Sequence, residues 1–368
     1  MSKMKVPFVD LSIQYQLIKE ELDVAFSEVF GNSQFIGGDP VDAFEKDFAQ
    51  YLGVAHCISC GNGTDALELA LKALDLKAGD EVIVPANSWI STAEAVTNIG
   101  GRPVFVDVSP LTYNLDVNLL SEAISSKTRG IIVVHLAGMP AQISEILAFA
   151  DKNGLFVLED CAQAHGASIN EKKVGSFGHA ATFSFYPTKN LGAYGDAGAV
   201  VTSDSFLAER VQRLSNHGTL FKHDHLFPGR NSNLDTIQAA FLNVKLKYLD
   251  SWNHRRNQVA NWYHQYLPAG LRVHKVPKGF YHTYHLFVVE VQKRDRLKVF
   301  LEDRGVATGI HYPVAIPYTE AYKSFTNSND SFPVALQLSE DCLSLPMFPE
   351  LEEEQVRYVC SVINDFHS

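Results

Sequence analysis

Residues Val54 to Leu74 read VAHCISCGNGTDALELALKAL and contain a strand pattern, a glycine turn and a helix pattern in succession. Val54–Ser59 is short and apolar, as a buried strand is, and Asp65–Leu74 has apolar residues at helical spacing. Further helical patterns cover Leu119–Ile124 and Ile143–Lys152. Further apolar strand candidates are Glu81–Pro85, Pro103–Val108, Gly130–His135, Leu155–Glu159, Ala181–Tyr186 and Gly198–Thr202. Such alternation predicts a three-layer α/β fold, with helices on both faces of a mostly parallel sheet.

The pattern changes after about residue 235. Asp235–Leu267 is predicted as one long amphipathic helix, and it is followed by a strand-like segment, a helix, an extended segment and a final helix: Tyr281–Val291, Arg294–Arg304, Thr308–Tyr312 and Leu351–Phe366. At about 150 residues per domain, a chain of 368 residues suggests roughly two domains. We therefore expect residues 1–245 to form an N-terminal segment with a large ligand-binding domain, and residues 246–368 to form a smaller α+β domain.

Composition excludes several classes of function. The chain carries 31 Lys and Arg against 42 Asp and Glu, a net charge of −11, so long-range attraction to nucleic acid or anionic membranes would have the wrong sign. The longest apolar run, Ile131–Met139, is too short to span a bilayer, and the N-terminus lacks the apolar core of a signal peptide. Among five cysteines, Cys57 and Cys60 form a CxxC without a second pair at metal-ligand spacing. We expect a cytoplasmic protein without a disulfide framework or a bound metal.

Glycines and a hydroxyl residue lie between the first strand and its helix, in Gly61–Leu67. Gly63 lets the backbone approach a ligand closely, and Thr64 can cap the helix or offer its hydroxyl and N–H to an anion. The pattern matches neither the Walker A loop nor the GxGxxG fingerprint. A plain strand-to-helix turn is the simpler interpretation, and a phosphate site is the alternative.

Two carboxylates end another predicted strand, in LEDCAQAHG from Leu158 to Gly166. Asp160 would be largely desolvated there, at the edge where parallel sheets present ligand groups. A buried carboxylate needs a cationic partner or good hydrogen-bond donors. A protonated pyridine nitrogen would satisfy Asp160, and a helix cap or a local salt bridge is the alternative.

A lone lysine follows an alternating strand in TFSFYPTKNLG, from Thr182 to Gly192. A surface position is the ordinary expectation for lysine, but Lys189 lies just past a buried strand and close to glycines. Partial desolvation there would make its amine neutral and nucleophilic, as Schiff-base chemistry requires. Ser184, earlier on the same strand, could also reach an anion.

The three loops together describe one cofactor, pyridoxal 5′-phosphate (PLP), which needs a phosphate site, a partner for its ring nitrogen and a lysine for its aldehyde. With these features the sequence resembles the DegT/DnrJ/EryC1/StrS family of sugar aminotransferases, which have the fold-type-I architecture of aspartate aminotransferase. The likeness covers nearly the whole chain. It also includes VPFVDL at Val6–Leu11, FIGG at Phe35–Gly38, Phe44-Glu45, GDEVIVPAN at Gly79–Asn87, PVFVDV at Pro103–Val108, GIHYP at Gly309–Pro313 and LPMFP at Leu345–Pro349.

This resemblance implies a role for each matching residue. Lys189 would be the catalytic Schiff-base lysine, and Asp160 would pair with the pyridine nitrogen. Asn231 matches an asparagine that reaches the phosphate of the neighbouring subunit, so the resemblance also implies an obligatory homodimer. The other cofactor contacts would be Gly63, Thr64 and Ser184 for the phosphate, Gln163 for the ring oxygen, and Trp89 for stacking on the ring.

Substrate contacts are less specific. The family usually has arginine where this chain has Asn233, which leaves contacts near that position open. The loop ending at Arg230 carries His217, and both residues are candidates for diphosphate contacts, with a solvated mobile loop as the equal alternative. Tyr312 is expected to face the sugar, and Tyr186 is a further candidate for the substrate side.

The resemblance implies transfer of an amino group from L-glutamate to a nucleotide-linked keto sugar. The phosphate loop NGTDAL, Asn62–Leu67, is more similar to members that act at C3, such as those that handle dTDP-3-keto-6-deoxyhexoses for lipopolysaccharide O-antigens, other surface glycans or antibiotics. The alternatives are a C4 aminotransferase for a UDP-, GDP- or dTDP-linked 4-keto sugar, a sugar 3-dehydratase, and a non-catalytic regulator that binds PLP or a nucleotide sugar. The dehydratase branch has histidine in place of Lys189, and a regulator need not keep Lys189, Asp160 and Gln163 together.

Overall fold

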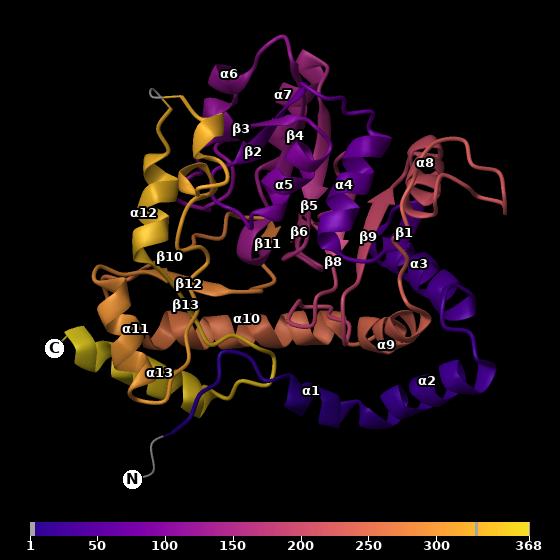
Figure 1. Cartoon of the computed structure of the whole chain (residues 1–368). Coiled ribbons are helices and arrows are strands. Elements are labelled where there is room, and N and C mark those ends of the chain that lie inside the picture. The colour runs from indigo at the N-terminus through magenta and orange to yellow at the C-terminus, as the bar shows by residue number, and fades with distance from the viewer. Residues whose placement is uncertain (1–3, 328–329, 368) are drawn as a thin grey trace.

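A seven-stranded sheet occupies the middle of the computed structural model, which describes residues 4–327 and 330–367 (Figure 1). The strand order is β1-β9-β8-β5-β4-β2-β3. Neighbouring strands run parallel except at β9, which is antiparallel to both β1 and β8, so the predicted mostly parallel sheet is confirmed. The strands are β1 (His56–Cys60), β2 (Glu81–Pro85), β3 (Arg102–Val106), β4 (Thr128–Val134), β5 (Phe156–Asp160), β8 (Ala180–Ser184) and β9 (Gly198–Thr202).

Helices cover both faces of this sheet. Because successive side chains of a strand point to opposite faces, Ile132 and Val134 of β4 belong to one core cluster, whereas Ile131 and Val133 belong to another. The first cluster includes residues of α4 (Gly63–Ala73), α5 (Ser91–Asn98) and α8 (Ser205–Ser215), and the second includes residues of α6 (Leu120–Ala123) and α7 (Ile143–Asn153). A third cluster packs α3 (Asp39–Leu52) and α9 (Thr236–Leu246) against β1, β8 and β9. The predicted three-layer arrangement is therefore present.

The C-terminal part of the chain builds a second, three-stranded antiparallel sheet in the order β10-β12-β13. Its core packs Val289 and Leu343 of this sheet with Val259 and Tyr263 of α10 and with Val359 of α13. A small third sheet joins β11 to β6 and β7 of the loop after β5. The elements are α10 (Leu249–Tyr266), β10 (Arg272–Val273), β11 (Phe280–Tyr281), β12 (Phe287–Glu290), α11 (Arg294–Glu302), α12 (Pro333–Asp341), β13 (Cys342–Leu345), α13 (Glu353–His367), β6 (Ser168–Ile169) and β7 (Lys172–Lys173).

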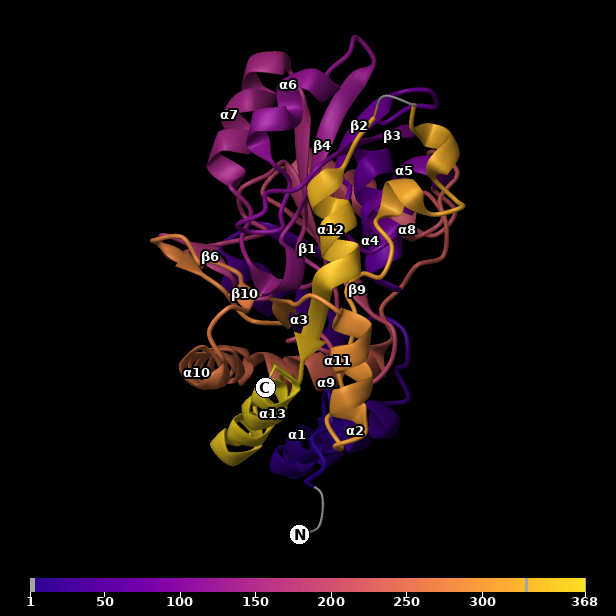
Figure 2. The same ribbon diagram turned by 90° about the vertical axis from the view of Figure 1, so that its left-hand side faces the viewer.

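The N-terminal helices run along the lower edge of the molecule in both views (Figures 1 and 2). Ile18 and Leu22 pack against Val244 of α9 and Trp252 of α10. Before these helices, Val6 donates its backbone N–H to the Gly305 carbonyl at 2.9 Å. The two helices are α1 (Leu11–Leu17) and α2 (Lys19–Asn32), and short 3₁₀ turns elsewhere cover Val117–Leu119, Leu136–Gly138, Ile316–Tyr318 and Lys323–Phe325.

Two sequence predictions were wrong in detail. The single helix predicted for Asp235–Leu267 is two helices, α9 and α10, with Lys247 and Tyr248 between them. Apolar spacing continues across the break, but the two helices serve different cores: α9 packs on α3, whereas α10 packs on the second sheet.

No helix of the described residues is long and apolar enough to cross a bilayer.

The strand predicted for Tyr281–Val291 is interrupted between β11 and β12, which belong to different sheets. In the interruption, Thr283 donates its N–H to the Gly138 carbonyl at 3.0 Å and Leu286 donates to the Ala137 carbonyl at 3.3 Å. Tyr284 has a φ of +45°, which a regular strand does not allow. The backbone of this segment therefore bonds to the turn after β4 instead of continuing either strand.

Candidate active site

Asp160 is the last residue of β5 and is 6% exposed. The Thr92 hydroxyl donates to its Oδ2 at 3.0 Å, and the Ala162 N–H donates to its Oδ1 at 3.2 Å. Burial raises the pKa of Asp160, while the two hydrogen bonds and the charge of Lys189 act in the opposite direction. A carboxylate held between neutral donors in a buried site is well suited to a cationic ring nitrogen.

Lys189 lies in the loop after β8, with a partly buried side chain. Burial lowers the pKa of its amine to about 8, and the Asp160 carboxylate opposes that shift. With a pKa near 8, about a tenth of the amine is neutral at pH 7. The charges of Lys189 and Asp160 therefore interact at one edge of the sheet, and Lys189 has the partly neutral amine that a nucleophile needs.

The first turn of α4 is the candidate anion site. The first N–H groups of a helix have no acceptor inside it, and here the Asn62 side chain takes the N–H of Asp65 at 2.8 Å. Gly63 lies against Ser184, since a Cβ on Gly63 would come within 2.7 Å of the Ser184 Cβ. The structure thus brings Gly63, Thr64 and Ser184 together at the positive end of a helix.

The cap of α4 is Asn62, so of the two roles considered for Thr64, capping the helix or binding an anion, the first is wrong. Asn62 has the extended backbone of an N-cap residue, whereas Thr64 is already inside the helix. The Thr64 hydroxyl instead donates to the Ser91 hydroxyl at 2.8 Å. That bond links the phosphate loop to the start of α5.

Gln163 is buried and has both ends of its amide bonded. Its Oε1 accepts the Ala137 N–H at 2.7 Å, and its Nε2 donates to the Tyr312 hydroxyl at 2.9 Å. The Tyr312 ring lies 5.7 Å from the Trp89 ring, centroid to centroid. Trp89 is 57% exposed and Tyr186 is 53% exposed, so two large aromatic side chains stand open at this site.

The remaining predicted residues belong to the loop after α8, which extends from the edge of the molecule in Figure 1. The Arg230 guanidinium pairs with Asp65 at 2.8 Å and Glu68 at 2.9 Å on α4. Asn231 is exposed and accepts a hydrogen bond from the Asn233 amide at 2.6 Å. The exposed His217 donates its backbone N–H to the Arg230 carbonyl at 2.9 Å. These residues therefore contact α4, the end of α8 and other residues of the same loop.

Sequence reasoning missed the hydroxyl group that bonds to Asp160 and the second hydroxyl next to it. Thr92, at the start of α5, donates directly to this carboxylate, and Ser88 lies 2.9 Å from Thr92, hydroxyl to hydroxyl. The four-residue spacing of Ser88 and Thr92 at a helix start was a visible signal. Their partner Asp160 is far away in the sequence, and the pattern did not point to it.

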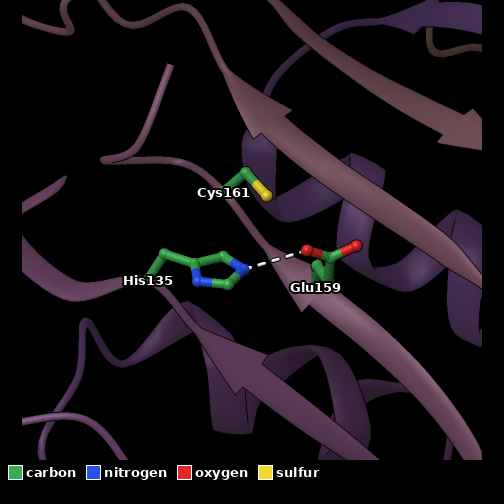
Figure 3. A group of neighbouring side chains, drawn as sticks. All are labelled: His135, Glu159 and Cys161. Carbon is green, nitrogen blue, oxygen red and sulfur yellow. Dashed lines mark hydrogen bonds and ion pairs between the residues drawn. The ribbon is translucent and has the colours of Figure 1, made fainter. Parts of the chain in front are cut away.

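A buried histidine, glutamate and cysteine gather beside the end of β5 (Figure 3). His135 Nε2 lies 3.0 Å from Glu159 Oε2, while His135 Nδ1 accepts the Ala141 N–H at 2.9 Å. Glu159 also accepts backbone N–H groups from the loop after β7, and burial raises the pKa of the Cys161 thiol well above its usual value. The nitrogen and oxygen donors are thus already bonded, which fits a structural role better than a metal centre.

The family model described as the DegT/DnrJ/EryC1/StrS aminotransferase family matches residues 16–364. The chain belongs to this family. Its aminotransferases depend on PLP, so the chain is a PLP-dependent aminotransferase, as the sequence predicted. The residues found at the sheet edge fit that cofactor: a helix N-terminus for a phosphate, a buried carboxylate for a ring nitrogen and a lysine with a lowered pKa.

The chain is similar over almost its full length to curated members of the family. It is 43% identical over 359 residues to a UDP-N-acetyl-3-dehydro-alpha-D-glucosamine 3-aminotransferase of Acidithiobacillus ferrooxidans, covering 97% of each chain. It is 42% identical over 362 residues to a dTDP-3-amino-3,6-dideoxy-alpha-D-galactopyranose transaminase of Aneurinibacillus thermoaerophilus, covering 98% of this chain and 99% of the relative. A GDP-perosamine synthase of Escherichia coli O157:H7 is 35% identical, over 90% of this chain and 91% of its own.

Two further comparisons bear on function and fold. A Geobacillus stearothermophilus relative named pleiotropic regulatory protein is 43% identical, with 99% of each chain covered. The solved structure of Streptomyces venezuelae DesV in complex with a ketimine intermediate superposes with a TM-score of 0.96 at 39% identity, covering 98% of each chain. The predicted aminotransferase fold of type I is therefore confirmed.

Proposed function

We propose that this enzyme transfers the amino group of L-glutamate to C3 of a dTDP-linked 3-keto-6-deoxyhexose. The pairing of Lys189 with Asp160 at one edge of the sheet carries the amino-transfer chemistry. The choice of C3 is supported by the form of the phosphate loop and by relatives named for 3-amino products, at 42–43% identity. Such products would supply lipopolysaccharide O-antigens, other surface glycans or antibiotic sugars, made in the cytoplasm.

Bound PLP supplies a ring that accepts the electrons released when the Cα–H bond of the amino donor breaks. Lys189 would hold the cofactor through its Nζ and, once the amino donor has displaced it, would move the proton at Cα as a neutral amine. The Asp160 carboxylate would keep the proton on the ring nitrogen, and Gln163 would donate toward the ring oxygen. Gly63, Thr64 and Ser184 would bind the phosphate, and the exposed Trp89 would cover the ring face.

The functional unit is proposed to be a homodimer with shared sites. Asn231 would reach the phosphate in the partner's site, which fits its exposure at the edge of the chain. Tyr186, His217, Arg230 and Tyr312 would line the substrate side. For Arg230, a role in substrate binding requires that its guanidinium contact the substrate while it stays paired with Asp65 and Glu68 of α4. The division into a PLP-binding part at 1–245 and a smaller part at 246–368 stays a prediction.

Two other functions have a specific observation behind them. The similarity to a GDP-perosamine synthase favours a C4 aminotransferase for a UDP-, GDP- or dTDP-linked 4-keto sugar. The similarity to a protein named as a regulator favours a non-catalytic PLP- or nucleotide-sugar-binding role. The lowered pKa of Lys189 favours the catalytic role over the regulatory one, because a sensor does not need a partly neutral amine near Asp160.

The test is incubation with glutamate and a panel of dTDP-, UDP- and GDP-linked 3-keto and 4-keto sugars, with products identified by mass and NMR. We expect a 3-amino sugar from the dTDP substrate and 2-oxoglutarate in equal amount. A 4-amino product would select the C4 alternative. A yellow wild-type protein that glutamate does not bleach, or a Lys189→Ala variant with full turnover, would overturn the proposed chemistry.

A further inference from the structure

Two buried asparagines, one of them the residue that follows Lys189, are hydrogen-bonded to each other. Asn190 is 3% exposed and follows Lys189 in the chain, and Asn253 is 1% exposed and lies on α10. The Asn190 Nδ2 donates to the Asn253 Oδ1 at 2.8 Å. A polar pair this deep is costly unless its other groups are also bonded.

The other groups of the pair are bonded. Asn190 Nδ2 also donates to the Thr283 carbonyl at 3.0 Å, and its Oδ1 lies 3.2 Å from His285 Nδ1. Asn253 Nδ2 donates to the His165 carbonyl at 2.8 Å. Since the Thr283 and His165 carbonyls can only accept, turning either amide over would place oxygen against oxygen. The orientation of both side chains is therefore fixed by the backbone around them.

The pair connects the two loops that carry the proposed catalytic groups. His165 belongs to the loop that follows Asp160, and Asn190 belongs to the loop that carries Lys189. The next residue, Gly166, has no room for a side chain, because a Cβ would lie 2.7 Å from Asn253 Nδ2. Asn253 thus lies tightly against the first loop and bonds to the second.

The other hydrogen bonds of the lysine loop are internal or lead to α9, where Lys245 Nζ donates to the Gly192 carbonyl at 2.6 Å and Gln238 Oε1 accepts the Tyr194 N–H at 2.8 Å. Lys189 donates its N–H to the Tyr186 carbonyl at 2.8 Å, and Ala193 donates to the Phe185 carbonyl at 2.7 Å. None of these bonds leads to the loop after β5. The side chain of Asn190 connects the turn to α10 and, through Asn253, to the loop after β5.

We propose that the Asn190–Asn253 pair is a positioning device that fixes the backbone of Lys189 relative to Asp160. The inference rests on the roles proposed above for Lys189 and Asp160. A proton-transferring amine must reach its target within a few tenths of an ångström, and a misplacement of about 1 Å can slow a reaction about 100-fold. The pair acts through Lys189 and does not itself touch the reacting atoms.

The test compares Asn190→Leu, Asn253→Leu and the double variant with a matched control, Asn243→Leu. Asn243 lies on α9, and its side chain donates to the Pro40 carbonyl of α3 at 2.8 Å instead of to the lysine loop. One measurement is the single-turnover rate with glutamate per bound cofactor, with and without deuterium at Cα. The second uses the apo-protein, where the pH dependence of Lys189 acetylation, read by mass spectrometry, gives the pKa of this amine.

We expect each variant to react at least about 10-fold more slowly, with a larger deuterium effect and little change in glutamate KM. In the apo-protein, the Lys189 pKa should rise from about 8 toward its ordinary value, because a freed amine becomes more hydrated. The double variant should be no slower than the slower single variant, since both changes break the same connection. The Asn243→Leu control should change neither readout.

The proposal is overturned if the variants lose thermal stability as the control does but keep the wild-type rate and the wild-type Lys189 titration. If a leucine variant does not fold, Asn190→Ala and Asn253→Ala decide by the same two measurements. Failure of the proposed function is a separate result: cofactor that stays covalently attached in Lys189→Ala would refute it. The apo-protein titration of Lys189 does not depend on that outcome.

Discussion

The side-chain amide of Gln163 donates to the hydroxyl of Tyr312 at 2.9 Å, across 149 positions of sequence. Tyr312 comes from the segment before α12, whereas Gln163 follows Asp160 in the loop after β5. The Gln163 Oε1 accepts the Ala137 N–H, so the bond to the Tyr312 hydroxyl fixes the other end of this side-chain amide.

Tyr312→Phe should therefore loosen Gln163 without removing the ring next to Trp89. We expect a fall of about 3- to 10-fold in kcat/KM for the keto sugar, which corresponds to one neutral hydrogen bond. Steady-state kinetics with both substrates measures the effect. Tyr318→Phe, at an exposed tyrosine before α12, is the control and should keep wild-type values. A Tyr312→Phe enzyme with unchanged kinetics would show that this bond does not matter for turnover.

Thr92→Val removes the hydroxyl that donates to Asp160 and keeps the shape of the side chain. Without that donor the pKa of Asp160 should rise further, so its carboxylate holds a cationic ring nitrogen less well. We expect PLP to bind about 10-fold more weakly, as for a lost hydrogen bond to a charged group. Equilibrium dialysis of the apo-protein gives the affinity. Thr97→Val, on the same helix but bonded to the Glu94 carbonyl, should bind PLP as wild type does.

Lys245 is a second lysine with a lowered pKa, and it predicts a pH-dependent stability. Its side chain is 1% exposed, its Nζ donates to the Gly192 carbonyl at 2.6 Å, and burial lowers its pKa to about 8. The unfolded chain, with an ordinary pKa near 10.5, binds this proton more tightly, so stability rises between about pH 8 and 10.5. The rise attributable to Lys245 is on the order of 3 kcal/mol.

Lys245→Met should remove that part of the rise. Urea unfolding at pH 7.5 and pH 10 gives the two free energies, and Lys247→Met, at an exposed neighbour, is the control. Equal pH dependence in Lys245→Met and wild type would mean that the lysine is hydrated in the folded protein.

The cluster of His135, Glu159 and Cys161 predicts insensitivity to metal removal. Its nitrogen and oxygen donors are taken by hydrogen bonds, so dialysis against a chelator should leave both the melting temperature and the activity unchanged. Elemental analysis of the purified protein should find less than about 0.1 zinc per chain, since an occupied structural site would hold one ion. One zinc ion per chain, with destabilisation on chelation, would contradict this assignment.

Local sequence patterns were sufficient for the seven strands of the central sheet and for placing Asp160 and Lys189 at its edge. Asp160 and Lys189 could be found because each follows a short apolar strand, and parallel sheets gather such residues at one edge. Strand direction could not be found this way: Gly198–Thr202 reads like its neighbours, yet β9 is antiparallel. Thr92 and Asn253 escaped notice because their partners lie 68 and 63 positions away and meet them only in the folded chain.

The pairing of β11 with β6 limits how the enzyme can open and close. This small sheet joins the C-terminal part of the chain to the loop after β5, and at a second place Thr283 and Leu286 donate backbone N–H groups to the Gly138 and Ala137 carbonyls in the turn after β4. A hinge rotation of the second sheet relative to the central sheet would have to break backbone hydrogen bonds at both places. Substrate entry should therefore depend on motions of short surface segments, such as the loop that ends at Arg230, over a rigid frame.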